Sequence, residues 1–180
     1  MICKPNCCFK ETKPDGGQIV LSVDTTSGKC PAGEKRGEEN IAAGKIPVLS
    51  CEGACIRGEI ARNVANLISK EEGFTRGCHG ELLTVPDSAI ARWIRASEKV
   101  IVIDGCFLKC HERIFKNIID ERKIKSYDAL TYYGKYTEFF DADSIPEEEI
   151  KQVAKEVAGK ILSDIKNQSA ASGRTSGKCS

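Results

Sequence analysis

The stretch from Lys99 to Cys110 reads KVIVIDGCFLKC, and the fold is built around it. Val100 to Ile103 form a run of four β-branched residues that ends at an Asp-Gly pair. A short apolar run of this kind predicts a central strand that is buried on both faces, as in a parallel sheet. Gly105 allows a sharp turn after the strand, and the pattern beyond it predicts a helix that continues to about Arg122.

A second stretch has the same form. Residues 46–55 read IPVLSCEGAC, and the pattern after them predicts another helix. In both stretches a C-x-x-x-C pair follows the predicted strand, at Cys51 and Cys55 and at Cys106 and Cys110. Because parallel strands in one sheet end at the same edge, where α/β proteins bind their ligands, we expect these four thiols to converge there.

The remaining elements alternate in the same way, which predicts the α/β class. We expect a single domain, with a mostly parallel central sheet and helices on both faces. The domain is predicted to span residues 1–166, and the Ser/Gly-rich residues 167–180 to form a disordered tail. Other expected features, in chain order, are a strand at 18–24, a long loop at 25–44, a short strand or extended segment at 81–85, a helix at 88–98, a strand leading into a loop at 127–136, and a long helix after 144.

Composition excludes several classes of protein. The 180 residues include 27 basic and 26 acidic side chains, which are interspersed along the chain. This balance argues against nucleic acid as a partner, because phosphate binding needs a basic surplus or patch. The apolar runs are too short to span a membrane, and the first ten residues lack the apolar core of a signal peptide. We therefore predict a cytoplasmic protein without a membrane partner.

The cysteine content is high, with ten in the chain. In a cytoplasmic protein that is large enough to form its own core, cysteine pairs more often bind metal or perform redox chemistry than form structural disulfides. Cys3, Cys7 and Cys8 lie close together at the N-terminus, and they form either a metal-gathering arm or part of an edge strand.

The paired thiols have the spacing of a metal site. Zinc prefers four sulfur or nitrogen ligands, commonly supplied by two short-spaced pairs that are far apart in sequence. Thiolate, the form that binds metal, is favoured at helix N-termini, where Cys51, Cys55, Cys106 and Cys110 are all predicted to lie. Cys78 is a fifth candidate, between the two pairs.

Three polar residues near these thiols have alternative interpretations. His111 is expected to point into solvent, because it is about 100° around the helix from Cys110, and His79 is a weak candidate ligand. Asp104 is expected to accept hydrogen bonds from backbone amides at the turn. The alternative is a role for Asp104 beside the metal, as a general base or as the partner of a ligand.

At these residues the sequence resembles the DGC-domain family of zinc-binding proteins. The DGC run at 104–106 follows a VIVI strand and precedes Cys110, and the CEGA turn at 51–54 and Cys78 are similar to the family's other elements. The resemblance covers about residues 46–119 and departs from the family at Glu52 and in the extra thiols. It implies a zinc ligand set of Cys51, Cys78, Cys106 and Cys110, with Cys55 as a further candidate.

The sequence therefore predicts a metal-binding protein, with zinc as the cofactor and a metal ion as the partner. One alternative is a [4Fe–4S] cluster, held by three cysteines with one iron open, that takes sulfur from a small sulfur-containing molecule. Another is a thiol-disulfide oxidoreductase, because paired thiols at helix N-termini are prone to redox chemistry. A nucleotide site is disfavoured, because neither glycine turn carries a dinucleotide or P-loop motif.

Overall fold

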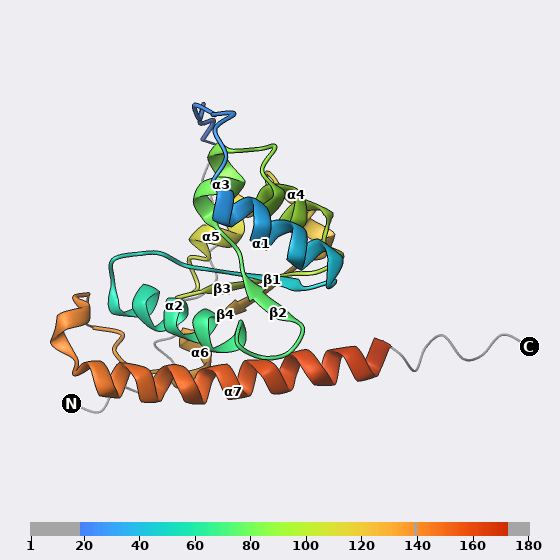
Figure 1. The fold of residues 1–180 in the computed structure, drawn as a ribbon. Coiled ribbons are helices and arrows are strands. Elements are labelled where there is room, and N and C mark those ends of the chain that lie inside the picture. The colour runs from blue at the N-terminus through green and yellow to red at the C-terminus, as the bar shows by residue number, and fades with distance from the viewer. Residues whose placement is uncertain (1–18, 139, 173–180) are drawn as a thin grey trace, which may run out of the picture.

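The computed structural model describes residues 19–138 and 140–172, which form a layered α/β structure (Figure 1). Its elements, in chain order, are α1 (Pro31–Ala42), β1 (Ile46–Ser50), α2 (Ile56–Ile68), β2 (Phe74–Arg76), α3 (His79–Thr84), α4 (Ala89–Ala96), β3 (Val100–Asp104), α5 (Cys110–Phe115), η1 (Glu121–Lys123), β4 (Ile124–Asp128), α6 (Leu130–Tyr133), η2 (Ala142–Ser144) and α7 (Glu147–Ser172).

The sheet confirms the predicted fold class. Its strands are all parallel, in the order β2-β1-β3-β4. The two strands predicted from the cysteine stretches, β1 and β3, are neighbours, with Val48 opposite Ile101 and Ser50 opposite Ile103. The chain adds β2 on one side of β1 and then crosses to β3 on the other side. The order of the strands therefore reverses between β1 and β3, which makes their carboxyl ends the switch point where such folds bind ligands.

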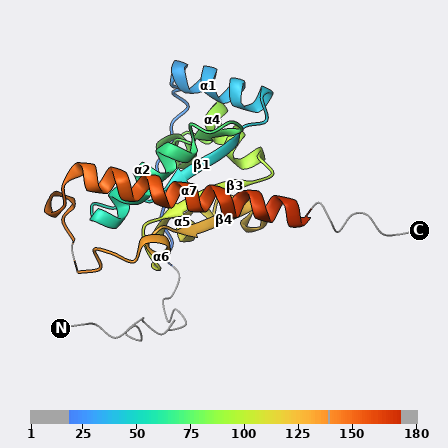
Figure 2. The same ribbon diagram turned by 90° about the horizontal axis from the view of Figure 1, so that it is seen from below.

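Helices cover both faces of the sheet, as the buried strands predicted. On one face Val48, Ile101 and Ile103 pack in a core cluster with α2 and α7. On the other face Leu49 and Val102 pack against α4 and α5. Figure 1 shows the two layers, with α2 and α7 below the sheet and α4 and α5 above it. In the view from below, the long helix α7 crosses the molecule (Figure 2).

The predicted loop at 25–44 was wrong over most of its length, because residues 31–42 form α1. The thiol of Cys30 caps the helix by accepting a hydrogen bond from the Gly33 amide, and Pro31 follows at the first helical position, where proline is favoured. A Cβ at Gly37 would lie 2.4 Å from the carbonyl carbon of Ala89 in α4. The glycine that suggested a loop instead allows two helices to pack closely.

Several other boundaries differ from the prediction. Residues 19–24 carry no regular secondary structure, and residue 18 lies outside the described residues. The predicted extended segment at 81–85 lies mostly in α3, where Leu82 is buried in the α4 face of the core. The last strand is β4, and α6 follows where the strand was predicted to continue. Helix α5 begins only at Cys110, because Lys109 takes a left-handed conformation with φ of +47°.

The C-terminal helix is longer than expected. Helix α7 continues through Ser172, into the segment predicted as a disordered tail, and residues 173–180 lie outside the described range, as do Cys3, Cys7 and Cys8. Its buried side chains include Val157, Ile161 and Ile165. None of the helices in the described ranges combines the length and the apolar character that crossing a membrane requires.

Candidate metal site

Three side chains meet at the switch point between β1 and β3. They are Cys51, directly after β1; Asp104, the last residue of β3; and His111, in the first turn of α5. Each offers one ligand atom, and these atoms all lie within 4.8 Å of one another. We call this set the Cys51–Asp104–His111 group.

Asp104 is the buried anchor of the group, with 1% of its surface exposed. Its Oδ1 accepts a 3.0 Å hydrogen bond from the amide of His111, and its Oδ2 accepts a 3.1 Å bond from the amide of Glu112. Burial raises the pKa of this carboxyl, while the two amides act in the opposite direction. The expected hydrogen bonding to backbone amides is confirmed, and these bonds hold the start of α5 against the end of β3.

His111 turns inward, so the prediction that it points into solvent was wrong. Its Nδ1 is buried, has no hydrogen-bond partner, and lies 3.9 Å from Oδ1 of Asp104. Its Nε2 accepts a 3.4 Å hydrogen bond from the Glu52 amide. The error came from the neighbouring residue, because the prediction took Cys110 to face inward and the structure leaves Cys110 exposed. His111 is the next residue, about 100° further around the helix, and it therefore faces Asp104.

Cys51 is held by backbone contacts on both sides. Its amide donates a 2.8 Å hydrogen bond to the Ile103 carbonyl, and its Sγ accepts a 3.4 Å bond from the Gly53 amide. Burial raises the pKa of the thiol, and amides of Gly53 and Gly105 offset part of that effect. A cation at the group would favour the thiolate by direct coordination.

Gly105 explains how the two predicted turns come so close. A Cβ at this position would lie 2.7 Å from both the carbonyl carbon and the carbonyl oxygen of Arg57, and 3.0 Å from the amide nitrogen of Gly58. These atoms belong to the backbone of the first turn of α2, which cannot move aside as a flexible side chain can. The glycine of the DGC run therefore lets the end of β3 lie directly against α2.

A second histidine, His79, packs beside the group. The sequence had indicated it only as a weak candidate ligand. Its ring centroid lies 5.6 Å from that of His111, and its Nε2 accepts a 3.3 Å hydrogen bond from the Ser50 amide. Burial, together with the charge of Arg76, lowers the pKa of His79 to about 4, although Glu52 acts in the opposite direction. His79 is therefore neutral at pH 7, and the Ser50 amide and the rings of His111 and Phe115 hold it at the sheet edge.

The predicted cysteines lie around this edge, but only Cys51 belongs to the group. Cys55 is the N-cap residue of α2, and Cys106 lies in the turn before α5; both are half-buried. Cys78 is the N-cap residue of α3, and Cys110 is the first residue of α5; both are exposed. The group found among the described residues therefore offers one sulfur, one carboxylate and one imidazole as ligands.

The donor set fits a metal ion, and the Nδ1 atom of His111 supports this assignment. A buried nitrogen without a partner is costly, and a metal ion would supply the missing partner. Binding at Nδ1 places the ring proton on Nε2, which can then no longer accept the Glu52 amide. We therefore expect the turn after Cys51 to adjust when metal binds.

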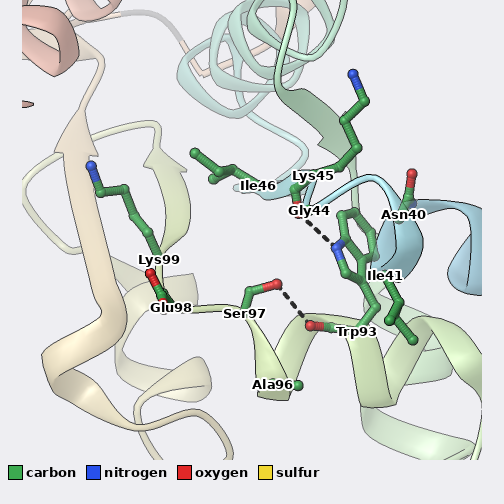
Figure 3. Close-up of a pocket in the computed structure, with 10 residues that line it drawn as sticks. All are labelled: Asn40, Ile41, Gly44, Lys45, Ile46, Trp93, Ala96, Ser97, Glu98 and Lys99. Atoms are coloured by element: carbon green, nitrogen blue, oxygen red, sulfur yellow. Dashed lines mark hydrogen bonds between the residues drawn. The ribbon is translucent and has the colours of Figure 1, made fainter.

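The cavity at the opposite, amino edge of the sheet does not contribute to this site. It has a volume of about 590 Å³ and lies beside the starts of β1 and β3. Figure 3 shows Trp93 donating a hydrogen bond to the Lys45 carbonyl and Ser97 donating one to the Trp93 carbonyl. Both polar groups of these side chains are thus satisfied within the protein, and Trp93 itself is only 2% exposed.

The fold and the site together define a doubly wound α/β protein with a candidate metal group at its switch point. The chain belongs to the DGC-domain family, whose profile matches residues 47–157. This match confirms the resemblance seen in the sequence, and it includes all three members of the Cys51–Asp104–His111 group. Comparisons with curated proteins and with solved structures found no match.

Proposed function

We propose that this protein binds zinc at the carboxyl edge of its sheet, with Cys51, Asp104 and His111 as ligands. The observation that supports the proposal is the convergence of the three donor atoms within 4.8 Å of one another. A thiolate and a carboxylate together balance the charge of Zn²⁺, and a neutral imidazole completes a donor set that zinc accepts.

The composition of the group favours a single zinc ion over an iron–sulfur cluster. A [4Fe–4S] cluster is held mainly by cysteine thiolates, whereas the group contributes one sulfur. Zinc takes nitrogen, oxygen and sulfur ligands in the same site. The iron–sulfur cluster predicted as an alternative would need Cys106 and other nearby cysteines as its ligands, in place of Asp104 and His111.

The ligand set implied by the family resemblance is the competing arrangement for the same ion. It consists of Cys51, Cys78, Cys106 and Cys110, with Cys55 as a further candidate. Four thiolates give a closed, structural zinc site, whereas three mixed ligands leave one position for water or a small sulfur-containing molecule. The two arrangements share only Cys51, so variants at the other positions distinguish them.

The decisive experiment measures zinc and iron in protein purified without oxygen. We expect about one zinc per chain, little iron, and loss of the zinc in Cys51→Ser, Asp104→Asn and His111→Gln. Cys30→Ser, which alters a thiol at the start of α1, is the control and should keep its zinc. Loss of zinc in Cys78→Ser, Cys106→Ser and Cys110→Ser, with retention in Asp104→Asn and His111→Gln, would favour the four-cysteine set. Equal metal content in all variants would overturn the proposal.

A further inference from the structure

A second cluster of polar side chains lies around the turn at Gly105. It contains Arg57, in the first turn of α2; Cys106, directly after Gly105; and Tyr133, at the end of α6. All three residues are half-buried. We call this set the Arg57–Tyr133 cluster; none of its members belongs to the Cys51–Asp104–His111 group.

Two buried atoms of this cluster lack hydrogen-bond partners. They are Nε of Arg57 and the hydroxyl oxygen of Tyr133. Within the described ranges, no carboxylate lies within 4.0 Å of the Arg57 guanidinium. By contrast, Arg62 and Arg76, which also lie near this end of the sheet, each form an ion pair with Glu52. A guanidinium and a hydroxyl that are buried without acceptors are costly, and each such group calls for a specific partner.

Two backbone contacts bring these residues together: a Cβ on Gly105 would lie 2.7 Å from the Arg57 carbonyl, and the Ala129 amide, directly before α6, donates a 2.8 Å hydrogen bond to the Asp104 carbonyl. Burial raises the pKa of the Tyr133 hydroxyl, and the positive charge of Arg57 opposes the shift. Burial also raises the pKa of the Cys106 thiol, where Arg57 again acts in the opposite direction. Asp128 raises the pKa of both groups, and one of its oxygens already accepts the Leu130 amide. Within the described ranges, the cluster therefore has two buried groups without partners, and Asp128 is an acid that acts on both Tyr133 and Cys106.

We propose that Arg57 and Tyr133 bind a small oxyanion, either a carboxylate or a phosphate-like group, beside Cys106. The planar guanidinium presents its donors in a fork that matches such an anion, and the Tyr133 hydroxyl supplies one further donor. The site adjoins the edge where this fold class binds its ligands. The proposal goes beyond zinc binding and holds with or without the metal.

The test is a titration of the full-length, chelator-treated protein with acetate, phosphate or sulfate, followed by amide chemical shifts. We expect saturable shifts around residues 56–58 and 130–133, and binding at least about tenfold weaker in Arg57→Gln. Tyr133→Phe removes one hydroxyl and should also weaken binding, while Asp128→Asn should strengthen it by removing the nearby negative charge. Arg92→Gln, which alters a paired arginine on α4, is the matched control.

The outcomes separate this inference from zinc binding, because no metal is present in the titration. Tighter binding of acetate would identify the anion as a carboxylate, and tighter binding of phosphate or sulfate would identify a tetrahedral group. Equal affinity in the wild type and in both Arg57→Gln and Tyr133→Phe, or no saturable shift with any of the anions, would overturn the proposal. If Arg57→Gln fails to fold, Tyr133→Phe alone decides the question.

Discussion

Asp104 contacts His111 in two ways from a single oxygen. Oδ1 accepts the backbone amide of His111 at 3.0 Å and lies 3.9 Å from Nδ1 in the side chain of the same residue. The carboxylate thus fixes the start of α5 and, through it, the position of the imidazole. An interaction that holds the backbone in place also brings two of the three proposed ligands together.

Replacing Asp104 with Asn tests this double role. An amide side chain has one acceptor oxygen instead of two, so either His111 or Glu112 loses its backbone partner. We expect faster hydrogen exchange at one of these amides in the metal-free protein, corresponding to about 1 kcal/mol of lost protection. Asp120→Asn is the control, because the hydrogen bonds that the described structure records for its carboxylate all come from the exposed Arg122. Unchanged exchange at both amides would contradict the role assigned to Asp104.

Zinc should stabilise the folded protein. A ligand that binds only the native state adds about 2.7 kcal/mol at a concentration of a hundred times its Kd, which corresponds to a rise in melting temperature of roughly 5–10 °C for a domain of this size. The measurement is thermal unfolding with a chelator and then with added zinc. His111→Gln should abolish the rise, and His79→Gln should retain it, because His79 lies outside the Cys51–Asp104–His111 group. The same rise in both variants would argue against His111 as a ligand.

Gly105 should tolerate no side chain. In Gly105→Ala the new Cβ meets the backbone of Arg57 at 2.7 Å, so β3 and α2 must move apart. We expect a loss of about 1–3 kcal/mol in the free energy of unfolding, measured by denaturant titration. Gly159→Ala is the matched control, because nothing lies within 4 Å of a Cβ at this exposed position in α7. It should stabilise the protein by about 0.5–1 kcal/mol, and a neutral Gly105→Ala would contradict the packing described here.

Glu34 should make the stability depend on pH in the acid range. Its Oε1 accepts the Ala89 amide at 2.6 Å, and this bond, followed by that from Lys29, lowers the pKa of the carboxyl below 4.5. A lowered folded-state pKa means that the contribution is fully present above pH 4.5 and disappears as the pH falls through the folded-state value. Glu34→Gln should therefore have a lower melting temperature than the wild type at pH 7, and the difference should shrink at pH 3.

The comparison for that experiment is Glu72→Gln. The described structure records no hydrogen bond or ion pair for the Glu72 side chain, so the variant should follow the wild type at both pH values. A difference between wild type and Glu34→Gln that stays constant from pH 7 to pH 3 would show that Glu34 acts through packing and not through its charge.

The buried strands could be predicted from the sequence because their signal is local. The run of β-branched residues before Asp104 became β3, and the stretch before Cys51 became β1, because both strands are covered by helices and are apolar on both sides. Helix α1 could not be predicted in this way. Its Gly37 is explained only by the backbone of Ala89, which is far away in the sequence.

The site was predictable in part for the same reason. Cys51 directly follows one predicted strand and Asp104 lies at the end of the other, so the position of both residues at the sheet edge could be inferred. The inward position of His111 depends on where α5 begins, and the left-handed residue Lys109 sets that point. The conformation of Lys109 therefore decides whether Cys110 or His111 faces Asp104. The hydrophobic periodicity of the sequence does not reveal that conformation. The four-cysteine ligand set stays a prediction.

The packing of α1 and the end of α7 has a consequence for the minimal folding unit. Helix α1 lies before the matched residues 47–157, yet it contributes Glu34 to the amide of Ala89. Ile161 and Ile165 lie after that range, and both are buried in the core on the α2 face. A fragment cut to the boundaries of the family match would therefore lose the contact of α1 with α4 on one layer and buried core side chains of α7 on the other. We therefore expect the autonomous folding unit to be larger than the matched segment, with expression boundaries before Lys29, which pairs with Glu34, and after Ile165.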